Sequence, residues 1–83
     1  MGKIEIEFSK EAAKQYKKLP KGYKRLVDIA LYRLSQNLHI DLKPIKGERD
    51  IYRIRVGKYR VLIRMFERAV LVFRISSRGD VYK

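Results

Sequence analysis

Apolar and charged residues alternate at the start of the chain, in the stretch KIEIEF. Ile4, Ile6 and Phe8 occupy every second position, and glutamates stand between them. Successive side chains of a strand point to opposite faces of a sheet. This period of two therefore predicts a strand over residues 3–8 that buries its apolar face and leaves its acidic face in solvent.

Helical periodicity replaces this alternation farther along the chain. Ser9 is a favoured N-cap residue, and apolar residues follow at helical spacing as far as Leu19, where a proline and a glycine interrupt the pattern. A second apolar stripe predicts another helix from about Gly22 to Leu38. Its members are Tyr23, Leu26, Val27, Ala30, Leu31, Leu34 and Leu38. The short turn between the two helices makes them a helical hairpin.

Runs of apolar and β-branched residues predict three strands in the second half of the chain. They cover residues 51–56, 59–65 and 70–76. The preceding residues 39–50 contain one proline and one glycine and are predicted to form a loop. Gly57 and Lys58 separate the first two strands and suit a type II′ turn, because glycine occupies the first central position.

The predicted order of elements is therefore β-α-α-β-β-β, in a single domain over residues 1–83. Two layers bury the apolar faces of such elements most simply. We expect an α+β fold in which the helical hairpin packs on one face of a twisted, mainly antiparallel sheet.

The two-residue turn also predicts the register of the hairpin that precedes the last strand. Val56 should lie opposite Tyr59, and Arg55 opposite Arg60. Apolar side chains then share the face that meets the helices: Tyr52, Ile54, Val56, Tyr59, Val61 and Ile63. Arginines share the other face: Arg53, Arg55, Arg60 and Arg64.

Like charges placed directly opposite each other in a sheet destabilise it by a few tenths of a kcal/mol to about 1 kcal/mol. The local sequence offers no carboxylate at the neighbouring outward positions to offset this repulsion. Arginine presents a planar fork that binds two phosphate oxygens at once. We therefore favour a phosphate-binding face over a merely solvated one, although solvated basic faces are common on small sheets.

The overall charge agrees with a polyanionic partner. Basic residues outnumber acidic residues by 21 to 9, and the net charge is +12. Cysteine is absent, which excludes disulfides and thiolate metal sites. No apolar run is long enough to cross a bilayer, and the first residues do not resemble a signal peptide. We expect a cytoplasmic protein that does not act at a membrane.

Several motifs together resemble the RelE/ParE superfamily of toxins from type II toxin–antitoxin pairs. They are the helical hairpin, the stretch LKPIKG, the hairpin YRIRVGKYRVLI, a hydrophobic strand and a terminal SRGDVY. The hairpin is the most specific of them, and the residues are more similar to RelE than to ParE. The resemblance implies a microbial-RNase-like fold, ribosome-dependent cleavage of mRNA in the A site, and an acidic RelB-like antitoxin as partner.

The resemblance also implies roles for individual residues. The residues that match catalytic positions of the family are Arg55, Arg60, Arg78 and Tyr82. Arg53 also matches a basic position of the family and is expected to bind RNA, orienting its backbone and stabilising charge together with Arg55. Lys58, Arg64 and Arg74 are further candidates for RNA binding that do not come from the resemblance, and the sequence leaves open which face Arg74 occupies. Some relatives carry a histidine just before the late arginine, whereas Ser77 stands there in this chain.

The expected reaction is attack of the RNA 2′-hydroxyl on the adjacent phosphate, without a metal or a cofactor. Arginine stabilises the charge that develops on the phosphate, but its pKa above 12 makes it a poor acid or base. The single histidine, His39, is predicted at the end of the second helix, where the helix dipole favours it for structural reasons. Positioning by the ribosome would then supply most of the catalysis.

Two other functions stay open at this stage. A ParE-like toxin would inhibit DNA gyrase by protein contact and would not need Arg78 or Tyr82. A non-catalytic basic domain would bind RNA or protein through the same face.

Overall fold

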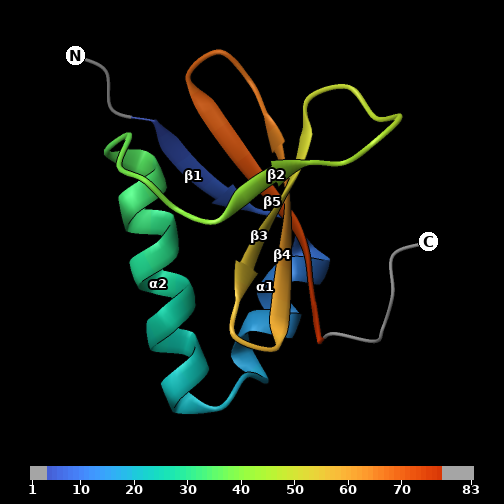
Figure 1. The fold of residues 1–83 in the computed structure, drawn as a ribbon. Coiled ribbons are helices and arrows are strands. Elements are labelled where there is room, and N and C mark those ends of the chain that lie inside the picture. Colours follow the sequence, from blue (N-terminus) through green and yellow to red (C-terminus); the bar gives the residue numbers. More distant parts are fainter. Residues whose placement is uncertain (1–3, 78–83) are drawn as a thin grey trace.

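The computed structural model describes residues 4–77, and residues 1–3 and 78–83 lie outside the described part (Figure 1). The elements are β1 (Glu5–Phe8), α1 (Lys10–Lys17), α2 (Lys21–Ser35), β2 (Leu42–Pro44), β3 (Ile51–Val56), β4 (Tyr59–Met65) and β5 (Ala69–Ser77). The strands form one sheet in the order β1-β5-β4-β3-β2. β1 pairs parallel with β5, and the other pairs are antiparallel, so the predicted α+β fold with a mainly antiparallel sheet is confirmed.

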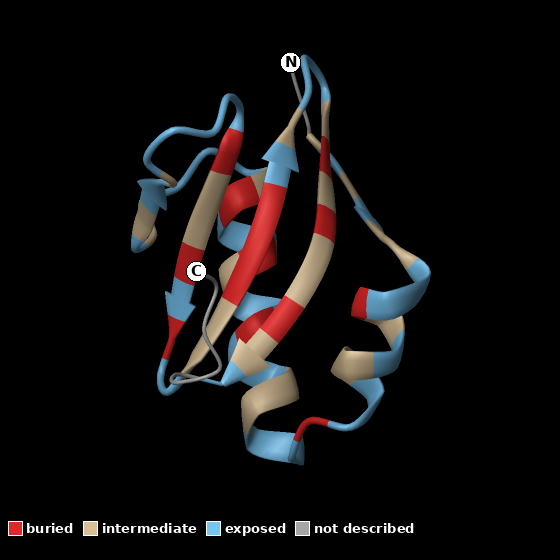
Figure 2. Cartoon of the chain, turned by 90° about the vertical axis from the view of Figure 1, so that its right-hand side faces the viewer, coloured by how far each residue is buried: buried red, intermediate tan, exposed pale blue. Residues whose placement is uncertain are grey.

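The two helices pack on the same face of the sheet and form the second layer (Figure 1). The buried core lies between the layers and consists of Ala12, Leu19, Val27, Leu31, Leu34, Ile54, Val56, Val61, Ile63, Val70, Val72 and Ile75. The inward residues predicted for the hairpin all belong to this core or pack against it. Figure 2 looks onto the opposite face of the sheet, which no helix among the described residues covers.

The start of α1 agrees with the sequence, whereas the end of α2 does not. The Ser9 hydroxyl accepts a hydrogen bond from the Ala12 amide at 3.0 Å, as an N-cap should. α2 ends at Ser35, before the predicted Leu38. Asn37 adopts a left-handed φ of 61°, and the Leu38 amide donates to the Arg33 carbonyl at 2.8 Å. This is the Schellman arrangement that ends a helix, so His39 lies in the following loop.

Residues 39–50 were predicted to be a loop, and this prediction was wrong for three of them. Leu42–Pro44 form the edge strand β2, and Lys43 pairs with Arg53 of β3. Proline is tolerated there because one side of an edge strand needs no partner for its backbone N–H groups. The extra strand extends the face of the hairpin that the arginines share.

Candidate nucleic-acid interface

The β3–β4 hairpin has the register that the turn predicted. Val56 lies opposite Tyr59, and Arg55 lies opposite Arg60. Gly57 has a φ of +60°, whereas Lys58 does not have a positive φ, which is the pattern of a type II′ turn. The fold therefore places Arg55 and Arg60 directly opposite each other on neighbouring strands, as the sequence predicted.

Leu62 occupies the middle of the arginine face. It lies opposite Arg53 across the hairpin, and only 2% of its surface is exposed although it is not part of the core between sheet and helices. Arg60 and Arg64 stand two positions before and after it on β4 and therefore point to the same side. Long basic side chains commonly cover apolar surface with their stems, and this agrees with the burial of Leu62.

Arg74 also lies on this face, because the pairing of β4 with β5 shifts between Leu62 and Ile63. Leu62 pairs with Arg74, but the next residue, Ile63, pairs with Val72. Simple alternation from the buried Val72 would have turned Arg74 into the core. The bulge reverses the alternation beyond it, so that Ile75 is buried and Arg74 points outward.

Helix α1 supports the same part of β5. β1 ends at Phe8, opposite Val72, and leaves the rest of that strand edge without a neighbouring strand. The Gln15 side chain replaces the missing strand as a hydrogen-bond partner, because its oxygen accepts a hydrogen bond from the Ile75 amide at 2.6 Å. The Ser9 hydroxyl also donates to the Phe73 carbonyl at 3.4 Å. These contacts position the bulge and hence Arg74.

One carboxylate reaches the arginines, contrary to the expectation from the local sequence. Asp41 Oδ1 lies 3.8 Å from Arg53 Nη1, and Asp41 Oδ2 lies 3.9 Å from Arg55 Nε. The Asp41 carbonyl accepts a hydrogen bond from the Arg55 amide at 3.1 Å, which places Asp41 beside the hairpin. The position of Asp41 could not be expected from the local sequence, because the strand that follows it was predicted to be a loop.

The two ion contacts are long, and they differ in exposure. The Arg53 side chain is 11% exposed, whereas those of Arg55 and Asp41 are 54% and 48% exposed. Arg53 Nη1 has no hydrogen-bond partner among the described residues, because 3.8 Å is an electrostatic contact and too long for a hydrogen bond. Asp41 therefore neutralises the arginines only in part.

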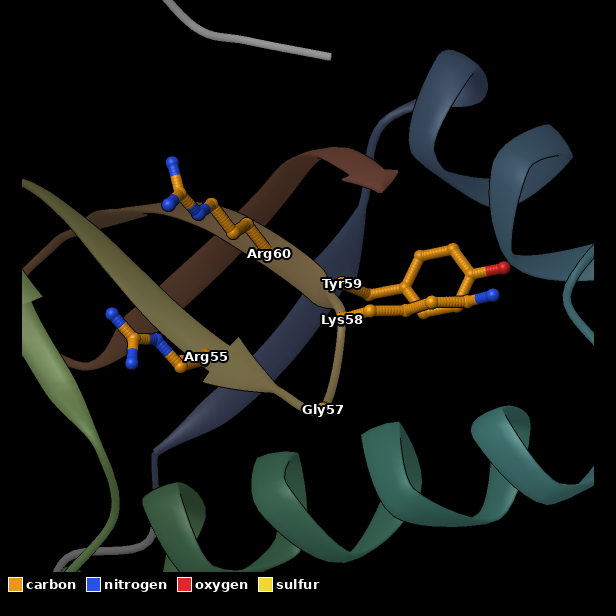
Figure 3. A pocket seen from close by; sticks show the side chains of 5 residues that line it. All are labelled: Arg55, Gly57, Lys58, Tyr59 and Arg60. Carbon is orange, nitrogen blue, oxygen red and sulfur yellow. The ribbon is translucent and has the colours of Figure 1, made fainter. Parts of the chain in front are cut away.

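A pocket of about 200 Å³ lies at the turn end of the hairpin (Figure 3). Its lining residues are Arg55, Gly57, Lys58, Tyr59 and Arg60. The side chains of Arg55 and Arg60 extend to one side, whereas those of Lys58 and Tyr59 extend the opposite way (Figure 3). Lys58 Nζ lies 6.0 Å from the centre of the Tyr59 ring. Lys58 is thus at the rim of the pocket and is not grouped with the arginines.

The positions of the other predicted residues differ. Arg64 is exposed and lies at the opposite end of β4 from the pocket. His39 is exposed in the loop after α2, where its carbonyl accepts a hydrogen bond from Arg33 Nε at 3.0 Å. Arg78 and Tyr82 lie outside the described residues, so their predicted roles stay predictions.

The described residues offer strong phosphate-binding groups and no arrangement suited to a metal. Arg53, Arg55, Arg60 and Arg74 gather on one face, and no group of three or more potential metal ligands is found between residues 4 and 77. None of the helices in that part of the chain is both long and apolar enough to span a membrane. The face can therefore bind and orient an extended polyanion.

Comparison with known proteins agrees with this geometry. The family described as the ParE toxin of the type II toxin–antitoxin system parDE matches residues 6–82. RelE1 of Methanocaldococcus jannaschii is 31% identical over 87 aligned residues, which cover 98% of this chain and 97% of that protein.

Solved structures show the same fold. In the RelB–RelE antitoxin–toxin complex from Methanococcus jannaschii, the matching chain has a TM-score of 0.76 and 28% identity, covering 86% of this chain and 88% of that one. The isolated Escherichia coli RelE toxin has a TM-score of 0.81 at 20% identity, covering 94% and 87%. The chain thus belongs to the RelE/ParE family of toxins from type II toxin–antitoxin systems.

Proposed function

We propose that this toxin is a metal-independent endoribonuclease that cleaves mRNA in the A site of the ribosome. The carrying observation is the opposed pair Arg55 and Arg60 at the mouth of the hairpin pocket, on the face that no helix of the described residues covers. Two arginines that pair across a hairpin repel each other in the free protein, and a phosphate bound between them would relieve this repulsion.

The proposed roles follow from the chemistry of arginine. Arg60 binds the phosphate at the cleavage site, and Arg55 stabilises the charge that develops on it as the 2′-hydroxyl attacks. Arg53 orients the RNA backbone. Arg78 and Tyr82 complete the site by assisting proton transfer or stacking on a base, as their match to the family implies. The ribosome aligns the attacking hydroxyl, and this alignment makes up for the lack of a histidine among the proposed site residues.

Primer extension on mRNA from a reconstituted translation system tests this proposal. We expect cuts within codons held in the A site, and slow cleavage of the same RNA without ribosomes. Arg60→Gln should reduce cleavage on ribosomes by at least about 100-fold, because it removes a charge that stabilises the transition state. Arg25→Gln removes the same charge from an exposed position of α2 and should cut like the wild type. Rapid cleavage of naked RNA, or full activity of Arg60→Gln, would contradict the mechanism.

The family match keeps a second function in view. The matching family is described as the ParE toxin. The alternative to mRNA cleavage is therefore inhibition of DNA gyrase by protein contact. A supercoiling assay with purified gyrase distinguishes the two. Inhibition of supercoiling at concentrations that leave translation intact would support the gyrase function and count against the nuclease.

The proposed partner is an acidic antitoxin similar to RelB. A net charge of +12 favours an acidic partner, and complexes of RelE with RelB are known among the structural relatives. Such a protein would cover the arginine face and keep RNA away from it. Because ribosomes and mRNA are the proposed targets, we place the toxin in the cytoplasm. If a short acidic protein is encoded next to this chain, its co-expression should restore growth of cells that produce the toxin.

A further inference from the structure

The outward side chains of the sheet form rows that run across the strands. In one row, Lys43 of β2 pairs with Arg53 of β3, which pairs with Leu62 of β4, which pairs with Arg74 of β5. Paired residues point to the same side of a sheet and have Cβ atoms about 5 Å apart. Arg53 and Arg74 thus flank one buried leucine, and Lys43 stands one strand beyond Arg53. This row is separate from the row of Arg55 and Arg60 at the pocket.

The two arginines of the row have unused hydrogen-bond donors. Arg53 Nη1 and Arg74 Nε are both buried, and neither has a hydrogen-bond partner among the described residues. Buried donors in folded proteins are nearly always paired, and an unpaired one calls for an explanation. Both arginines flank Leu62, so an anion that lies over this leucine could supply acceptors to their guanidinium groups once the side chains turn these buried donors toward it.

The spacing of the rows suits a nucleic acid backbone. Arg60 and Leu62 are two residues apart on β4, which corresponds to about 7 Å at a rise of about 3.4 Å per residue. This is comparable to the separation of neighbouring phosphates in an extended single strand. A strand of RNA that lies along β4 would therefore bring one phosphate to Arg55 and Arg60, and the adjacent phosphate to the row of Leu62.

We infer that Arg53 and Arg74, assisted by Lys43, form a second phosphate subsite centred on Leu62. The inference rests on the proposed function and adds to it a second binding position and an axis for the RNA strand, along β4. The ligand is a polynucleotide backbone with two successive phosphates. The bulge in β5 is essential to this site, because without it Arg74 would not point to the arginine face.

Short uncleavable probes test the subsite directly. One is a 2′-O-methyl dinucleotide with a single internal phosphate, and the other carries an additional 5′-phosphate. Titration of the purified full chain, followed by NMR, gives the ratio of the two affinities. We expect the wild type to bind the two-phosphate probe about tenfold more tightly, as a charge-assisted contact with arginine would give. Arg74→Gln should lower this ratio to below about twofold.

Two matched variants separate the effect of charge from other effects. Arg74→Lys keeps the charge and should retain a ratio above that of Arg74→Gln, although it loses the planar fork. Arg25→Gln removes a charge from the helix side of the molecule and should leave the ratio unchanged. With a longer 2′-O-methyl strand, the slope of log K against log salt should be smaller by about 0.7 for Arg74→Gln, the value for one lost phosphate contact.

The outcomes distinguish this inference from the proposed function. An unchanged ratio in folded Arg74→Gln, or a wild-type ratio near one, overturns the subsite even if the toxin cuts mRNA on ribosomes. A ratio that depends on Arg74 in a protein that does not cut mRNA supports the subsite and overturns the nuclease function. If Arg74→Gln does not fold, the test is made on the wild type. There the Arg74 side-chain resonance must shift more with the two-phosphate probe than with the one-phosphate probe, and equal shifts overturn the subsite.

Discussion

Asp41 provides the sharpest test of how far a carboxylate neutralises the positive charge of the arginine face. Its carboxylate lies 3.8 Å from Arg53 and 3.9 Å from Arg55, with about half of its side chain exposed. Each contact is worth about 1 kcal/mol at most in water, and exposed pairs usually contribute 0.2–1 kcal/mol. We expect Asp41→Asn to lower the free energy of unfolding by about 0.5–1 kcal/mol in urea titrations.

The same substitution should have the opposite effect on RNA binding. A phosphate bound between Arg55 and Arg60, at about 7 Å from the carboxylate, is repelled by about 0.6 kcal/mol in water, which corresponds to about threefold in affinity. Asp41→Asn removes this repulsion and frees the two guanidinium groups. Fluorescence anisotropy with a labelled 2′-O-methyl oligonucleotide at low salt should therefore show about threefold tighter binding.

The control is Glu67→Gln, which removes the same charge from the exposed connection between β4 and β5. It should change affinity less than Asp41→Asn does, and the difference between the two variants should shrink as salt is raised. Weaker or unchanged binding by Asp41→Asn would refute the reasoning, since it would mean that the carboxylate helps to hold the arginines in their binding positions.

Two further predictions concern stability. Gly57→Ala should destabilise the domain by at least about 1–2 kcal/mol, because φ is +60° and the new Cβ would lie 2.7 Å from Tyr23 Cε1. Gly22→Ala should instead stabilise the domain by about 0.5–1 kcal/mol, because its new Cβ has open space in α2. Thermal unfolding that shifts both variants in the same direction would contradict this contrast. The hydrogen bond from the Tyr16 hydroxyl to Asp28, with burial and the charge of Asp28 adding to it, raises the pKa of Tyr16 above its usual 10. The stabilisation from this hydrogen bond is therefore complete below about pH 10 and is lost as pH rises through the folded-state pKa of Tyr16. Wild type should be more stable than Tyr16→Phe by about 1 kcal/mol at pH 7, and urea titrations at strongly alkaline pH should show no difference between them.

The strands of the central hairpin could be predicted because three local signals agree. The same register is indicated by the alternating apolar residues, by the glycine at the first turn position and by the abrupt ends of both strands. β3 and β4 accordingly have the predicted bounds. The N-cap at Ser9 was visible for the same reason. Such features depend on the nearest few residues, and the sequence displays them directly.

The features that were missed or left open depend on contacts between distant segments. β2 has three residues, too few for a periodic signal, and it exists because β3 offers it an edge. The face of Arg74 depends on a bulge that forms against β4 and is held by α1. The end of α2 is a different case, because Asn37 is a favourable residue for the left-handed position and could have indicated the helix end.

The sheet separates the residues that stabilise the fold from those that bind RNA in the proposed function. On the inner face, Ile54 and Val61 are at most 1% exposed, and burying such a side chain contributes about 1.5–3 kcal/mol. On the outer face, the opposition of Arg55 and Arg60 costs about 1 kcal/mol at most. Because alternate residues of the same two strands serve the two purposes, the inner face can offset the repulsion of the outer face several times over. The sheet can therefore keep its arginines opposed in the free toxin, ready for a phosphate, without loss of the fold.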